Sequence, residues 1–106
     1  MRLPIDSVIA AEKIARYLLV RQRRGDKSAF LASAGYTGGT AQQLERDLRD
    51  QLRQYEALPA QRNRFGQYYE VAGILRGPNG KRLKVRTIWM REHLSGVTKF
   101  ITLIPD

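Results

Sequence analysis

The chain has 106 residues, of which 42% are hydrophobic and 27% charged, so it is long enough for one domain with a single core. It contains no cysteine, which excludes disulfides, thiolate zinc sites and a cysteine nucleophile. The formal net charge is +9, and residues 60–106 carry nine cations against three carboxylates. Such a basic surface favours a polyanionic partner, most commonly nucleic acid. An acidic protein or an anionic membrane would satisfy the same electrostatics, and so would charge that serves only to keep the protein in solution.

Neither a membrane helix nor a signal peptide is expected. No apolar run approaches the roughly 20 residues that a membrane-spanning helix needs. The first four residues, Met1 to Pro4, lead into a polar-punctuated helical pattern rather than an apolar stretch. Together with the lack of cysteine, this pattern indicates a cytoplasmic protein without a membrane partner.

The first predicted helix covers about residues 7–21. Asp6 is a good N-cap residue, and apolar residues recur at helical spacing from Val8 to Leu19. The cations of residues 21–24 suit a helix C-terminus, and Gly25 with Asp26 breaks the pattern.

Two more helices are predicted before residue 56. Asp26 can cap a short helix over residues 27–34, which Gly35 would end. Thr40 and Gln43 have the spacing of a capping box, which predicts that a third helix begins there. The buried stripe of this third helix is formed by Leu44, Leu48, Leu52 and Tyr55.

The last third of the chain predicts three antiparallel strands. Residues 58–63, with Pro59, are expected to be a connection, after which the strands cover about residues 66–75, 81–90 and 97–105. Residues 77–80 form the turn between the first two strands. With Pro78 and Asn79 at the turn centre, one face pairs Ile74 with Leu83, Ala72 with Val85, Glu70 with Thr87 and Tyr68 with Trp89, and the opposite face carries Tyr69, Val71, Lys84 and Arg86.

These elements predict a single α+β domain over residues 1–106, with three N-terminal helices packed on one face of a three-stranded antiparallel sheet. Trp89 is expected to be buried against the helices. The opposite face is basic and open, which is common in nucleic-acid surfaces and also in any small α+β protein.

The chain lacks the residues that most catalytic mechanisms require. His93 is the only histidine and falls in a predicted loop, no carboxylates or imidazoles share metal-ligand spacing, and no serine-nucleophile motif occurs. No metal or cofactor is therefore expected. Cleavage of RNA by its own 2′-hydroxyl needs only a positioned phosphate, charge stabilisation and proton transfer. The groups that could supply these are Lys13, Lys27, Tyr68, Lys84, Arg86, His93, Lys99 and Thr102.

Short segments spread along nearly the whole chain carry a family resemblance. Each is weak alone, but their order and spacing are distinctive together. The segments are Glu12-Lys13-Ile14, Tyr17-Leu18-Leu19, Gly25-Asp26-Lys27 with Phe30, Gly35-Tyr36, Gly66 with Tyr68 or Tyr69, Gly73, Gly77-Pro78-Asn79-Gly80, Arg86-Thr87-Ile88-Trp89 and Phe100 to Pro105.

In this order the segments resemble the bacterial domain of unknown function 6883. The resemblance implies a toxin module with a cognate antitoxin, because members occur as small proteins and at the ends of toxin-like proteins. Their layout is similar to the fold of several ribonuclease toxins, including relatives of RelE, colicin E5 and EndoU, although fold alone does not settle function. The matched polar residues Lys13, Lys27, Arg86 and Thr102 are the catalytic residues that the resemblance implies.

The sequence thus predicts a small, basic, metal-independent endoribonuclease of a toxin–antitoxin system. RNA is the expected substrate, and an acidic antitoxin or immunity protein is the expected inhibitor. Tyr69, Lys84, His93 and Lys99 are the predicted substrate-binding residues. Two alternatives remain: a nucleic-acid-binding module without chemistry, and an interaction domain that binds an acidic protein.

Overall fold

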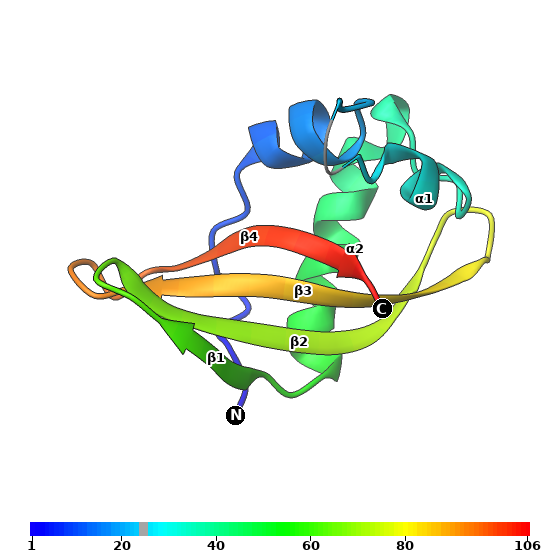
Figure 1. The fold of residues 1–106 in the computed structure, drawn as a ribbon. Coiled ribbons are helices and arrows are strands. Elements are labelled where there is room, and N and C mark those ends of the chain that lie inside the picture. Colours follow the sequence, from blue (N-terminus) through cyan, green and yellow to red (C-terminus); the bar gives the residue numbers. More distant parts are fainter. Residues whose placement is uncertain (24–25) are drawn as a thin grey trace.

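A computed structural model describes residues 1–23 and 26–106 and has the expected α+β fold (Figure 1). The antiparallel sheet has four strands in the order β1-β2-β3-β4, rather than three. The elements are the π-helix η1 (Lys13–Leu18), α1 (Ser28–Ala32), the 3-10 helix η2 (Gly38–Thr40), α2 (Ala41–Gln54), β1 (Leu58–Arg62), β2 (Gly66–Arg76), β3 (Arg82–Glu92) and β4 (Thr98–Pro105).

The additional strand is β1, where the sequence predicted only a connection. Pro59 lies in this strand and pairs with Tyr69 of β2. A proline cannot donate a hydrogen bond to a sheet, but on an edge strand the missing N–H can face solvent. Because β1 is at the edge of the sheet, Pro59 is compatible with the strand.

Helix α2 forms where the third helix was predicted. Its stripe of Leu44, Leu48 and Leu52 is buried, and α2 packs on β2. The capping box lies one turn earlier than expected: it is formed by Thr37 and Thr40 and belongs to η2.

The first helix is much shorter than predicted. Residues 1–10 are not helical, and Val8 instead pairs in parallel with β4 through Val8 N to Thr98 O and Phe100 N to Val8 O, both 2.8 Å. Asp6 therefore caps no helix. These backbone bonds cover part of the exposed edge of β4, which local helix propensity alone could not predict. Arg24 and Gly25, expected at the end of this segment, lie outside the described residues.

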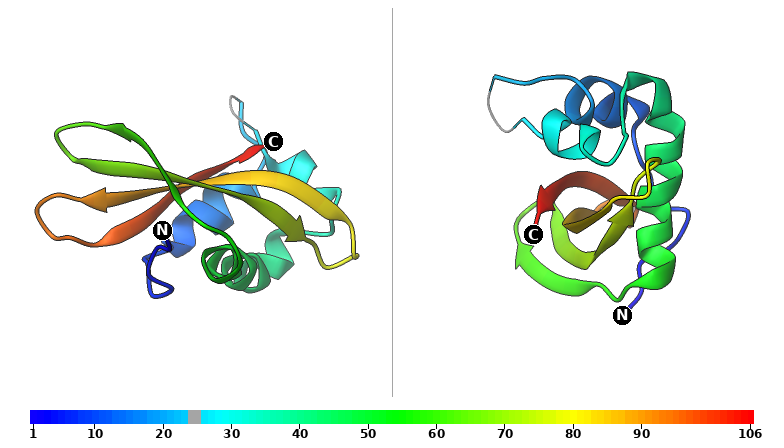
Figure 2. Two further views of the ribbon diagram at one scale, coloured as in Figure 1. Left: turned by 90° about the horizontal axis from the view of Figure 1, so that it is seen from below. Right: turned by 90° about the vertical axis from the view of Figure 1, so that its right-hand side faces the viewer.

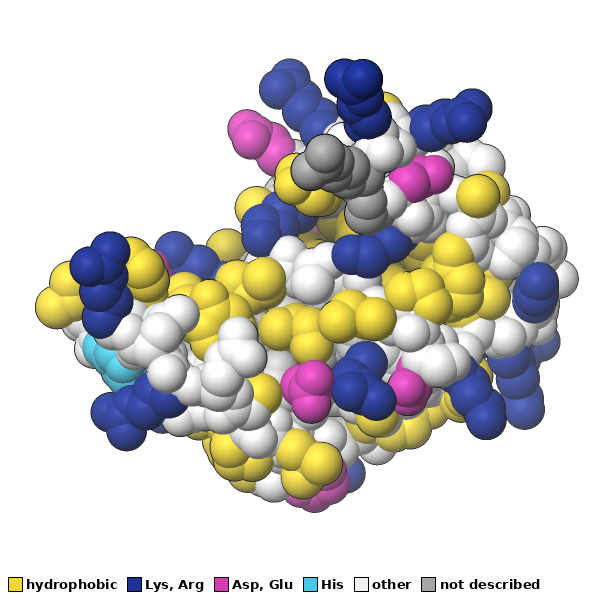
Figure 3. All heavy atoms as spheres, in the orientation of Figure 1, with side chains coloured by type: hydrophobic (Ala, Val, Ile, Leu, Met, Phe, Trp, Pro, Cys, Tyr) yellow, Lys and Arg dark blue, Asp and Glu magenta, His cyan; other side chains and the backbone are white. Residues whose placement is uncertain are grey.

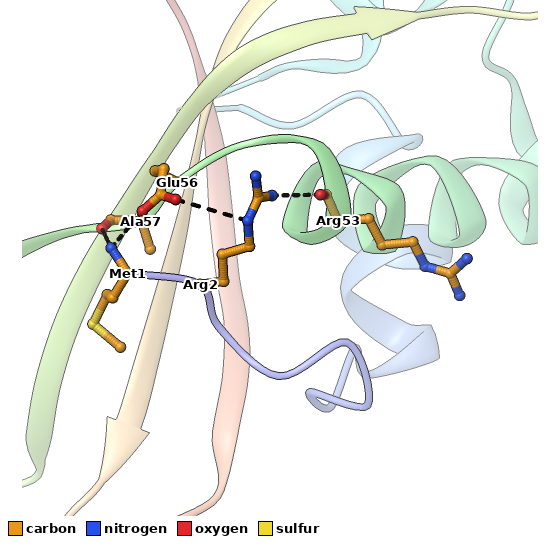
Figure 4. Close-up of polar contacts among 5 residues, drawn as sticks. All are labelled: Met1, Arg2, Arg53, Glu56 and Ala57. Atoms are coloured by element: carbon orange, nitrogen blue, oxygen red, sulfur yellow. Dashed lines mark hydrogen bonds and ion pairs between the residues drawn. The ribbon is translucent and has the colours of Figure 1, made fainter.

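The start of the chain is fastened to the end of α2 (Figure 4). The Met1 amino nitrogen lies 2.6 Å from Glu56 Oε2, and the Ala57 N–H donates to the Met1 carbonyl at 2.7 Å. The Arg2 guanidinium donates to the Arg53 carbonyl and lies near Glu56. These contacts hold the N-terminal segment along the helix before it reaches β4.

The short second helix, α1, is placed as expected. The Asp26 carboxylate accepts hydrogen bonds from the Ser28 N–H at 3.1 Å and the Ser28 hydroxyl at 2.7 Å, but Lys27 occupies the N-cap position, so Asp26 lies one residue before the cap it was predicted to form. Gly35, at φ +93°, follows the helix in a conformation that other residues rarely adopt.

The predicted register of the β2–β3 hairpin is wrong by one residue. Ile74 pairs with Lys84, and Tyr69 pairs with Trp89. The connection between the strands is five residues long, because the Gly77 N–H donates to the Lys81 carbonyl at 2.9 Å. The faces of β2 are therefore exchanged: Tyr69, Val71 and Leu75 face the core, whereas Tyr68, Ala72 and Ile74 share the opposite face with Lys84 and Arg86.

Contacts between this hairpin and the two residues that follow α1 explain the longer connection. The Asn79 N–H donates to the Ala34 carbonyl at 3.2 Å, and the Asn79 side chain donates to the Ser33 carbonyl at 3.1 Å. A Cβ on Gly77 would lie 2.0 Å from the Ala34 carbonyl oxygen, so only glycine permits this approach. Tertiary contacts thus select a turn that the local sequence did not specify.

Trp89 lies at the centre of the core, as predicted. Its side chain is fully buried, and its ring meets Phe100 edge-to-face at 5.3 Å between centroids. The Trp89 indole N–H donates to the Thr87 hydroxyl at 2.9 Å, which satisfies its polar atom inside the core.

The sheet extends beyond its helical cover. The ends of β2 and β3 nearest the connections 63–65 and 93–97 project away from the helices as an arm (Figure 1), and the strands curl strongly when seen end-on (Figure 2). Among the described residues, no helix has the length and apolar character required to cross a membrane.

Candidate functional site at the β4 edge

A β-bulge in β4 organises the candidate site. Trp89 pairs with Phe100, but its neighbour Ile88 pairs with Thr102, so Ile101 is an extra residue in β4. A bulge leaves its extra residue unpaired and redirects the neighbouring side chains. The Ile101 carbonyl is therefore available to a group from outside the sheet.

Two lysines from different segments bind at this bulge. Lys13 Nζ, from η1, donates to the Ile101 carbonyl at 2.8 Å. Lys27 Nζ, from the residue before α1, donates to the Thr102 hydroxyl at 3.0 Å. Three of the four predicted catalytic residues thus meet at one point, although 89 positions separate the first from the last.

A shallow pocket opens at the same place. It has a volume of about 360 Å³ and is lined by Lys13, Tyr17, Ile101 and Thr102. Tyr17 is 65% exposed and forms part of the wall. The pocket therefore combines one ammonium, two hydroxyls and an apolar surface.

The environment lowers the pKa of Lys13 below its ordinary value of 10.5, chiefly because partial burial penalises the charged ammonium. The nearby positive charge of Lys99 adds to this effect. A lysine whose charged form is disfavoured gives up its proton more readily, which suits proton transfer.

We expect Lys13 to titrate below its ordinary value of 10.5 when the pKa of its unmodified amine is followed by NMR. In Lys99→Gln, the pKa of Lys13 should rise, because a repelling charge is lost, but stay below 10.5, because the burial remains. An unchanged Lys13 pKa in this variant would contradict the electrostatic coupling between the two lysines.

Arg86, the fourth predicted catalytic residue, lies on the neighbouring strand. Ile88 pairs with Thr102 and Arg86 with Ile104, so Arg86 and Thr102 are diagonal neighbours on one face. Diagonal neighbours in a regular ladder are roughly 7 to 8 Å apart. Arg86 is therefore within reach of a ligand that touches Thr102.

Two carboxylates that sequence reasoning missed hold Arg86. Its guanidinium lies 3.0 Å from Asp106 Oδ1 and 3.6 Å from Glu70 Oε1. The adjacent negative charge of Asp106, followed by that of Glu70, raises the pKa of Arg86. The correct register would have revealed Glu70, because Glu70 is diagonal to Arg86 across β2 and β3.

The predicted substrate-binding residues do not form one group. Lys99 lies near Lys13 and pairs with Glu92 at 3.0 Å. Lys84 is on the face of Arg86 but two residues farther along β3. Tyr69, expected on that face, is 9% exposed and shares the core face with Trp89, because the register differs. His93 lies in the arm, where it and Tyr69 line a different pocket.

The described residues contain no group of three or more histidine, cysteine or acidic side chains arranged to hold a metal ion. The chemical resources of the β4 edge are ammonium, guanidinium, carboxylate and hydroxyl groups. These groups can bind a phosphate and can transfer protons.

Comparisons with known proteins bear on both the family and the fold. The family model described as "Domain of unknown function (DUF6883)" matches residues 5–106. Among solved structures, the chain is similar to one from a contact-dependent growth inhibition toxin–immunity protein complex of Klebsiella pneumoniae 342, with a TM-score of 0.62 and 18% identity over 95% of this chain and 94% of that one. No curated protein matches the sequence. The structural likeness shows a shared fold.

Proposed function

The chain belongs to the DUF6883 family, and from this premise we propose that it is a toxin-like endoribonuclease that cleaves RNA without a metal ion. The observation that carries the proposal is the convergence of Lys13, Lys27 and Thr102 at the β4 bulge. The fold shared with a chain of a toxin–immunity complex and the charge of +9 support the same class of function.

The proposed reaction is an attack by the RNA 2′-hydroxyl on the adjacent phosphate. The bond from O2′ to phosphorus forms while the bond from phosphorus to O5′ breaks, which leaves a 2′,3′-cyclic phosphate and a 5′-hydroxyl. The 2′-hydroxyl loses one proton to a base, and O5′ gains one from an acid. Lys13, with its lowered pKa, serves in the proton transfer.

The remaining residues of the site bind the phosphate in this proposal. Lys27 supplies a positive charge. When Lys27 binds the phosphate instead of the Thr102 hydroxyl, that hydroxyl donates a hydrogen bond to the phosphate. Arg86 can contact two phosphate oxygens, because its planar guanidinium matches that geometry. To make this contact, Arg86 gives up its ion pair with Asp106 or Glu70 and binds the phosphate instead. The carboxylate that is released becomes a second group able to accept a proton.

The proposal includes an inhibitory partner and a location. The basic surface would be neutralised by an acidic immunity protein or antitoxin, in line with the toxin–immunity complex to which the fold is similar. The protein would cleave cellular RNA in the cytoplasm.

Incubating the purified protein with RNA in excess chelator, at low and moderate salt, tests this function. Cleavage at both salt concentrations is expected, with weaker binding at the higher one because RNA binding releases counterions. Salt-sensitive binding without cleavage would instead indicate a nucleic-acid-binding module. Neither binding nor cleavage would indicate a protein-interaction domain and would refute the proposal.

A further inference from the structure

The tip of the projecting arm is a rigid surface that the proposed reaction does not use. We define the arm tip as Arg62, Arg64, Phe65, Arg91 and His93 (Figure 3, where the histidine is the cyan side chain).

Hydrogen bonds tie its two connections together. Asn63 Oδ1 accepts the N–H groups of Phe65 at 2.9 Å and Gly66 at 3.2 Å. The His93 N–H donates to the Phe65 carbonyl at 3.0 Å, and His93 Nε2 lies 3.0 Å from the Asn63 carbonyl. The backbone that carries Phe65 is thus fixed in place.

This fixed backbone presents an aromatic ring to solvent. Phe65 is 59% exposed although its backbone is well bonded. The Arg64 guanidinium lies over the ring, 4.8 Å from its centroid, so it covers one ring face. The rest of the ring is available to another flat group.

The strand ends next to the connection that carries Phe65 bear further cations. Arg62, Arg91 and His93 line a pocket of about 370 Å³, together with Gln67, Tyr69, Gly96 and one carboxylate, that of Glu92. Within residues 1–23 and 26–106, neither Arg62 nor Arg91 forms an ion pair. The adjacent carboxylate, Glu92, is already bound by Lys99 at 3.0 Å and Ser95 at 2.9 Å. The tip therefore attracts an anion.

We propose that the arm tip binds an unpaired nucleotide of single-stranded RNA, with its base stacked on Phe65 and the flanking phosphates on Arg62 and Arg91. An exposed aromatic ring among cations is the combination by which proteins bind single strands. Bases within a duplex are already stacked on one another, so they cannot stack on Phe65. The inference rests on the proposed function and names its substrate class: RNA with an unpaired segment beside the cleaved bond.

The arm tip and the β4 bulge lie a short distance apart along the sheet, but the pocket of Arg62 and Arg91 is on the face of Tyr69 and Thr102 is on the opposite face, so an RNA strand that contacts both must pass round the β4 edge. Glu92, next to the tip, is four residues along β3 from Ile88, the partner of Thr102. At a rise of about 3.3 Å per residue this separation is about 13 Å, a few nucleotides of an extended strand.

Binding of oligouridylate tests the inference, and the fluorescence of Phe65→Trp reports directly on the contact. The oligouridylate carries 2′-O-methyl groups in place of its 2′-hydroxyls, so that it stays intact under the proposed chemistry. Stacking on a base contributes about 1 to 3 kcal/mol, so Phe65→Ala should weaken binding roughly 5- to 150-fold. Phe65→Trp should keep the affinity and lose emission on binding. Leu94→Ala, which removes another exposed apolar side chain of the arm, should bind like the parent, and the same strand in a duplex with oligoadenylate should bind equally to the parent and Phe65→Ala.

The outcomes separate this inference from the proposed function. If Phe65→Ala and the parent bind oligouridylate with equal affinity and have the same thermal midpoint, the arm tip is not a nucleotide-binding site, even if the protein cleaves RNA. Emission of Phe65→Trp that responds to polyglutamate but not to oligouridylate would refute it too, in favour of an acidic protein. Phe65-dependent binding without any cleavage would support the arm tip while the proposed function fails.

Discussion

Trp89→Ala is expected to lower the free energy of unfolding by about 3 to 5 kcal/mol, the usual range for removing a large aromatic side chain from a core. The fully buried indole contacts Phe100 edge-to-face and donates to Thr87, so alanine leaves a cavity and removes one buried hydrogen bond. Domains of this size are stable by about 5 to 15 kcal/mol, so this single change removes a large share of the total stability. Urea unfolding followed by circular dichroism measures the change.

Leu58→Ala is the matched control for this prediction. Leu58 is 66% exposed on the edge strand β1, and surface substitutions usually change stability by less than about 0.5 kcal/mol. A loss for Trp89→Ala as small as that for Leu58→Ala would contradict the central position of the indole in the core.

Lys13→Ala is expected to abolish growth arrest and to reduce RNA cleavage by about 10²- to 10⁴-fold, as loss of a proton-transfer group typically does. Lys27→Ala is also expected to abolish growth arrest and to reduce RNA cleavage. The loss of Lys27 acts through phosphate charge rather than proton transfer and should weaken RNA binding as well. Thermal midpoints should stay almost unchanged, because both lysines bond at the sheet edge rather than in the core.

Two further variants make this prediction specific. Lys81→Ala removes an exposed lysine from the β2–β3 turn, so it reproduces the loss of charge without touching the bulge and should remain active. Lys13→Arg keeps the charge but not the ability to release a proton, so it should be as inactive as Lys13→Ala. Full toxicity of the alanine variants, or a loss explained by unfolding alone, would show that the site is assigned incorrectly.

The sequence predicted those elements whose signals are local. The leucine stripe specified α2, and Gly35 and the 77–80 turn marked the ends of α1 and β2. The β1 strand and the N-terminal segment were missed, because both owe their conformation to pairing with distant strands. The hairpin register was missed for a similar reason: Asn79 bonds to Ser33 and Ala34, just after α1, and these contacts lengthen the turn by an amount that local residues do not encode.

The candidate site was partly predictable for comparable reasons. The family resemblance picked out Lys13, Lys27 and Thr102, which do come together, but their meeting point depends on a bulge that no sequence pattern announced. Tyr69 was placed on the wrong face because the register error exchanges the faces of β2. Of the arm tip, His93 was a predicted substrate-binding residue, but Phe65 was missed, since its exposure follows from hydrogen bonds between two separate connections.

The most direct test of metal-independent RNA cleavage at the β4 edge is an analysis of product ends in the presence of chelator. RNA incubated with the protein should yield fragments with 2′,3′-cyclic phosphates and 5′-hydroxyls. The same oligonucleotide with every 2′-hydroxyl replaced by hydrogen should stay intact, because it lacks the nucleophile. Cleavage of that deoxy strand, products with 5′-phosphates, or no cleavage of the RNA would contradict the proposed chemistry.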